Sequence, residues 1–122
     1  MEQLTKRLKK EIRYHSERAW EAETRAALEA LAGKFDAWRS GAISSVDLNE
    51  AIHLHYTGIN RQIWRRFSPG NLDFGLAHAV ATGLITKDSL PDDVAAYIAP
   101  RVRWFERELE CPNAEGGDDQ DE

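Results

Sequence analysis

The chain has 122 residues, of which 42% are hydrophobic and 30% are charged. This composition is typical of a folded globular domain and excludes the disordered class. Its formal net charge of −5 lies at the C-terminus, because residues 1–114 hold 16 basic and 16 acidic residues and the rest adds Glu115, Asp118, Asp119, Asp121 and Glu122. The absence of net charge over residues 1–114 argues against a dedicated nucleic-acid binder, because such a protein needs several cations to neutralise phosphates.

Two further features of the sequence indicate the cellular compartment in which we expect the protein. No apolar run approaches the roughly 18 residues of a membrane-spanning helix, and no charged start followed by an apolar segment indicates secretion. The single cysteine, Cys111, cannot form an internal disulfide and lacks the surroundings that lower a thiol pKa. We therefore expect a cytoplasmic protein without a cysteine nucleophile.

Residues 1–40 predict helix, because they contain no proline and are rich in Glu, Lys, Arg, Ala and Leu. At about 100° per residue, one narrow sector of this helix holds Leu4, Leu8, Ile12, His15, Ala19, Ala22 and Ala26. A second sector, rotated by roughly 140°, holds Trp20, Ala27, Leu28, Leu31, Phe35 and Trp38. The apolar stripe thus changes face halfway along.

Two arrangements explain this change of face. A break near residues 14–16 would make two helices, whereas a continuous helix would pack its second half in its own domain and its first half on another chain. We favour the continuous helix, with a dimer interface at Leu4, Leu8, Ile12 and Ala19, because small residues in a narrow stripe allow close helix contact. The alternative is that this stripe covers the domain's own core.

A second helical region follows Gly41, which suits a helix stop. Ser44 with Asp47 three residues later resembles a capping box, and apolar residues continue the helix to Tyr56. We expect Gly58 to interrupt it, and a short helix to follow over residues 61–67.

The remaining segments are shorter. Residues 68–71 predict a turn, and residues 72–82 predict a buried helix because they carry little charge. Leu84 and Ile85 are expected to fill the core from a loop, since the run is too short for a strand.

Three prolines organise the C-terminal part. Pro91 fits the first turn of a helix, Pro100 predicts a kink or a separation into two helices, and Pro112 predicts the end of the last one. These elements predict an all-α fold: a compact bundle of five or six helices with one long N-terminal helix, in a single domain over residues 1–111. Residues 112–122 are expected to form a disordered acidic tail.

The spacing of the histidines gives little support for a metal site. Glu50 and His53 stand at i, i+3, the spacing with which di-iron bundles place two ligands on one helix face. A second such pair is absent, since Glu11 and His15 are four residues apart. We expect no metal and no cofactor; the alternative is a small-ligand or metal-dependent enzyme that uses Glu50 and His53 with His15 or His78.

A basic cluster around an aromatic residue gives the nucleic-acid alternative. Arg61, Trp64, Arg65 and Arg66 combine cations with a ring that could stack on a base. Charged residues on helices are more often a solvated face. We therefore favour nucleic-acid binding less than a protein-interaction function.

The blocks at residues 14–20, 33–38 and 47–53 resemble a group of small bacterial proteins without an assigned activity, of the kind carried by mobile integron gene cassettes. This resemblance implies a helical fold and supplies no catalytic residues. The change of face of the apolar stripe favours a non-enzymatic homodimer that acts as a protein-interaction or regulatory module with an unidentified protein partner.

Overall fold

The computed structural model describes residues 5–68 and 73–110, and within these ranges every regular element is helical. None of these helices is long and apolar enough to cross a membrane. The elements are α1 (Lys6–Arg39), α2 (Ser45–Leu54), the π-helical segment η1 (His55–Ile59), α3 (Asn60–Phe67), α4 (Phe74–Ala81), the 3₁₀ turn η2 (Lys87–Ser89) and α5 (Asp92–Glu110). Since α2, η1 and α3 follow one another without a gap, the described chain forms four rods and a 3₁₀ turn, slightly fewer than the five or six helices predicted.

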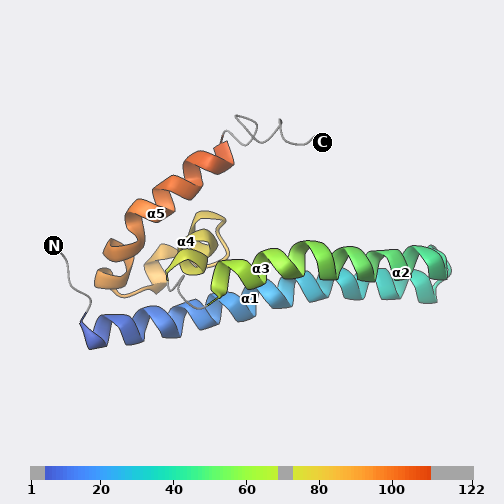
Figure 1. Ribbon diagram of the computed structural model, residues 1–122, viewed down its shortest axis with the longest axis horizontal. Helices are drawn as coiled ribbons and strands as arrows, with labels where there is room; N and C mark the ends of the chain where they lie inside the picture. Colours follow the sequence, from blue (N-terminus) through green and yellow to red (C-terminus); the bar gives the residue numbers. More distant parts are fainter. Residues whose placement is uncertain (1–4, 69–72, 111–122) are drawn as a thin grey trace.

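Helix α1 is continuous over 34 residues, which confirms the prediction of an unbroken N-terminal helix. Thr5 caps its start, where its hydroxyl accepts a hydrogen bond from the backbone N–H of Leu8 at 3.0 Å. Its end is followed by Gly41 at φ 86°. In Figure 1 the helix runs the length of the molecule, with α4 and α5 over its first half and α2–η1–α3 along its second half.

The first half of α1 is part of the chain's own core. Ile12 and Ala19 are completely buried there, and Leu8 packs against the same cluster. The predicted dimer interface is therefore wrong at Ile12 and Ala19, because they are buried in the chain's own core. Leu4, its fourth member, lies outside the described residues.

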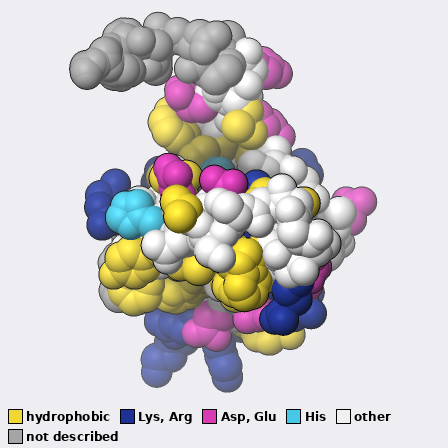
Figure 2. Space-filling model, turned by 90° about the vertical axis from the view of Figure 1, so that its right-hand side faces the viewer, with side chains coloured by type: hydrophobic (Ala, Val, Ile, Leu, Met, Phe, Trp, Pro, Cys, Tyr) yellow, Lys and Arg dark blue, Asp and Glu magenta, His cyan; other side chains and the backbone are white. Residues whose placement is uncertain are grey.

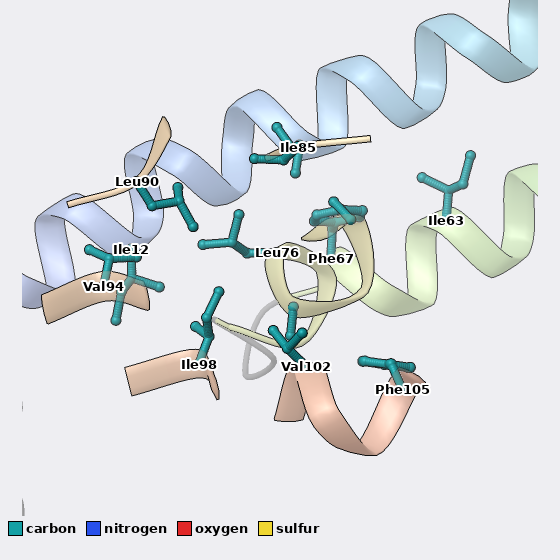
Figure 3. Packing of buried hydrophobic residues seen from close by; sticks show 13 residues of the cluster. Ile12, Ile63, Phe67, Leu76, Ile85, Leu90, Val94, Ile98, Val102 and Phe105 are labelled. Carbon is teal, nitrogen blue, oxygen red and sulfur yellow. The ribbon is translucent and has the colours of Figure 1, made fainter. Parts of the chain in front are cut away.

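Helices α4 and α5 supply most of this core. The helix α4 is buried nearly all round, as its low charge predicts. From α5, every third or fourth residue points inward, and Figure 3 shows Leu76 of α4 in the middle of the cluster, with Val94 beside Ile12. The inward-pointing residues of α5 are Val94, Ile98, Val102 and Phe105. Pro100 lies inside α5 without dividing it, and of the two loop residues expected in the core Ile85 is buried whereas Leu84 is exposed.

The second half of α1 and the rod α2–η1–α3 form a long antiparallel helical hairpin (Figure 1). The predicted capping box is present, with Ser44 and Asp47 bonding to each other's backbone N–H. Across the tip, Trp38 Nε1 donates to Ser45 Oγ at 2.9 Å. The α-helix is interrupted around Gly58, as expected, but the chain does not break there: it continues as a π-helix that ends in a bond from Asn60 N–H to the carbonyl of His55.

Two glycines allow the packing of α4 to be tested. A Cβ on Gly75 would overlap the ring of Phe67, whereas a Cβ on Gly33 would meet no atom within 4 Å. Gly75→Ala should lower the free energy of unfolding by about 1–3 kcal/mol through overpacking. Gly33→Ala, the matched control, should raise it by about 0.5–1 kcal/mol, since alanine restricts the unfolded chain and favours helix. Urea unfolding of both variants checks this; equal effects would contradict the packing described.

Candidate functional site

Three helices bring charged side chains together where the hairpin meets the core. Glu23 of α1 is only 8% exposed. Its Oε1 accepts a hydrogen bond from Arg66 Nη2 of α3 at 2.6 Å, and its Oε2 lies 3.1 Å from His78 Nδ1 of α4. The ring of His78 also packs edge-on against Phe105 at 5.1 Å between centroids. One buried carboxylate thus links three separate helices.

Opposing effects set the ionisation of Glu23. Burial by itself would raise the pKa of this carboxyl, but hydrogen bonds from His78 and Arg66 and their charges outweigh it, so that the pKa is lowered. An ionised carboxylate only accepts hydrogen bonds, and therefore His78 Nδ1 is the donor. When the ring is neutral, its Nε2 then offers a lone pair.

Arg66 is turned inward, which contradicts its predicted role on a nucleic-acid surface. Only 16% of its side chain is exposed, because its guanidinium is held against Glu23. Its Nε is buried and meets no hydrogen-bond acceptor among the described residues. Arg61, Trp64 and Arg65 remain at the surface, so that the predicted cluster loses one of its three cations.

The polar trio lies at one end of a long concavity. It lines a cleft of about 560 Å³, the polar cleft, whose other walls are mainly apolar: Ala26, Ala27, Ile59, Ile63, Thr82, Gly83 and Leu84. Towards the tip of the hairpin this cleft continues into an apolar groove of about 390 Å³, which is lined by Ala27, Ala30, Leu31, Lys34, Ala51, Leu54, His55 and Ile59. Ala27 and Ile59 belong to both. Each volume lies in the range of small-molecule sites.

The opposite side of the hairpin carries large exposed hydrophobic residues, here called the aromatic face: Leu28, Ile52, Tyr56 and Trp64. Helical geometry places them on one side, away from Ala30 and Leu54 of the groove. Tyr56 and Trp64 are 65% and 58% exposed, and they line a shallow recess with Asn60 and Arg61. Figure 2, which views the molecule from the end of the hairpin, shows patches of hydrophobic side chains at the surface.

The candidate ligands of the metal-dependent alternative do not converge. Glu50 and His53 are exposed on α2, and no three His, Cys, Asp or Glu residues of the described part come close enough to hold an ion. His15 is buried in α1, with Arg18 Nη1 3.4 Å from its Nδ1. Burial first, and then the charge of Arg18, lowers its pKa, while Glu11 opposes this. His15 is therefore biased to the neutral form.

Sequence reasoning missed Glu23. Its neighbours Glu17 and Glu21 are exposed, and a glutamate in such a helix is normally solvated. The only signal was its place between the two apolar stripes, at the level where the helix changes partners.

Comparisons with models of known protein families, with curated proteins and with solved structures find no match. The chemistry of these sites is therefore argued from their geometry alone.

Replacement of Glu23 tests the energetic role of the trio. Glu23→Gln leaves the Arg66 cation buried without its counter-ion, and should lower the free energy of unfolding at pH 7 by about 3 kcal/mol. Because the folded pKa lies below the ordinary value of 4.5, the contribution of the carboxylate is complete above that value and is lost as pH falls through the folded pKa. The difference between wild type and variant should therefore shrink in acid.

Glu29→Gln is the matched control. Glu29 lies on the same helix, 3.9 Å from Arg25, with 67% of its side chain exposed, and its loss should cost no more than about 0.5 kcal/mol. Urea unfolding at several pH values measures both variants. A Glu23→Gln effect that is as small as that of Glu29→Gln, or that does not change with pH, would contradict the role assigned to the carboxylate.

Proposed function

We propose that the protein is a non-enzymatic helical interaction module that forms a homodimer through the aromatic face of its hairpin. The observation that carries this proposal is the exposure of four large hydrophobic side chains, Leu28, Ile52, Tyr56 and Trp64, which helical geometry places on one side of the hairpin. Clustered apolar side chains of this size are costly to leave in water and mark interaction surfaces. Trp, Tyr and Arg are also the residues that dominate binding energy at protein interfaces, and Arg61 lies beside Tyr56 and Trp64.

A second copy is the partner that fits this face. Two helices cannot cover both of their sides, and two hairpins packed face to face form a four-helix bundle with a shared apolar interior. The same surface serves both copies, as an interface with two-fold symmetry requires.

The edges of the aromatic face are charged. Glu21 and Glu29 are exposed on the α1 side together with Arg25, which lies 3.9 Å from Glu29, and Arg61 is exposed on the α3 side. In a two-fold arrangement that lays α1 of one copy beside α3 of the other, these charges face each other. Such pairs at a rim favour the correct orientation more than they add affinity.

Light scattering on the full chain tests the dimer. At about 50 μM, a concentration chosen for micromolar affinity, wild type should have twice the 13.9 kDa mass of one chain. Trp64→Glu and Tyr56→Glu should each raise the dissociation constant at least about tenfold, since each buries a charge in an apolar interface. Val46→Glu is the control, because Val46 is 76% exposed and points away from this face by helical geometry.

A monomeric wild type would overturn the proposed dimer. So would dissociation by Val46→Glu to the same extent as by Trp64→Glu, because a general effect of charge would then explain both.

A further inference from the structure

The apolar groove and the polar cleft adjoin each other as one open depression, here called the channel, on the side of the hairpin opposite the aromatic face. They share Ala27 and Ile59. From Glu23 to Lys34 the channel follows α1 for roughly 16 Å, at about 1.5 Å per residue. Its walls are aliphatic along most of this length, and the buried charges stand at one end. A ligand that matches this shape has an unbranched apolar body and one polar head.

The hydrogen-bonding capacity left at the charged end selects the head group. Both oxygens of Glu23 already have partners. Arg66 Nη2 donates to Glu23 and its Nε is buried without an acceptor among the described residues, so the donors that remain for a ligand are those of the two Nη atoms. Arg66 and His78 keep 16% and 21% of their side chains exposed, and both line the cleft. The remaining donors of Arg66 need a hydrogen-bond acceptor. A guanidinium matches a carboxylate in charge and in geometry.

We propose that this channel binds an aliphatic carboxylate of medium chain length, with its head at Arg66 beside His78 and its chain along Ala27, Ile59 and Leu54. The binding is non-covalent, and it goes beyond the dimer because it uses the other side of the hairpin. Burial of the chain against aliphatic walls supplies most of the free energy. The contact with Arg66 sets the direction in which the ligand lies.

A local irregularity supports a ligand on this side. The π-helical segment η1 spans His55–Ile59, and both of these residues line the groove. Single π turns within helices occur frequently at functional sites. Lys34 is the one other cation of the channel, at the end towards the tip, and its exposed ammonium is the competing anchor for an anion.

Calorimetric titration of the full chain at pH 8 with decanoate, decanol and decyltrimethylammonium tests the head group. The three probes share one chain and differ in charge. Decanoate should bind with one site per chain, and the other two should bind at least about tenfold more weakly. Equal binding of all three, or no binding of decanoate, would overturn the proposal.

Two tryptophan substitutions on α1 test the location. Ala30→Trp places a ring in the apolar groove, at an exposed position where folding should be preserved. Ala32→Trp is the control, since Ala32 is exposed on the other side of the helix beside Leu28. Decanoate affinity should fall at least about tenfold in Ala30→Trp and stay unchanged in Ala32→Trp. Unchanged affinity in Ala30→Trp would overturn the assignment.

Two further variants fix the direction of the ligand and its independence from the dimer. Lys34→Met should keep the affinity for decanoate; a loss as large as that of Ala30→Trp would place the head at the other end and overturn the proposed anchor. Trp64→Glu, which should weaken the dimer, should also keep it. If the wild type is monomeric but still binds decanoate, the proposed dimer is wrong and the proposed ligand site stands.

Discussion

The length of α1 constrains everything else in this structure. Its 34 residues extend roughly 51 Å at about 1.5 Å per residue, which exceeds the width of a core that a chain of this size can build. The helix therefore has two sets of partners, with α4 and α5 on its first half and α2–η1–α3 on its second. It turns a different side to each of them, and this explains the apolar stripe that changes face.

The buried trio stands where these two halves meet. Glu23 of α1 binds Arg66 of the hairpin and His78 of the core helix α4. Removing charges from water is costly, and a buried ion pair adds little net stability compared with apolar packing. Its geometry nevertheless has few alternatives, because one carboxylate must reach two partners in separate helices. The trio consequently holds the hairpin in one position relative to the core.

The sequence was sufficient where local rules decide the structure. The continuity of α1, the capping box at Ser44 and the buried character of α4 follow from neighbouring residues and were predicted. The dimer interface at Ile12 and Ala19 was wrong because an apolar stripe does not identify its partner. Here the partner was the same chain's α4 and α5 rather than a second molecule.

The candidate sites were harder to predict, since their members are distant in the sequence. Glu23 lies 43 residues from Arg66 and 55 from His78, and no spacing rule connects such positions. The basic cluster proposed around Trp64 included Arg66 as a surface cation, although Arg66 points inward. The rotation of α3 about its own axis determines which of its side chains point inward. This rotation depends on the π segment, which the sequence signals only as Gly58.

The π segment is the local feature that makes the two sides of the hairpin different. A π turn contains one residue more than an α turn, so it rotates the following helix by roughly a quarter turn relative to a regular α-helix. With this rotation Ile63 and Phe67 are buried, Arg66 reaches Glu23 on the channel side, and Trp64 stays on the aromatic face. A regular helix through Gly58 would turn Phe67 away from the core and Arg66 away from its carboxylate. The irregularity at η1 thus determines both the buried trio and the exposed face from which the two proposals start.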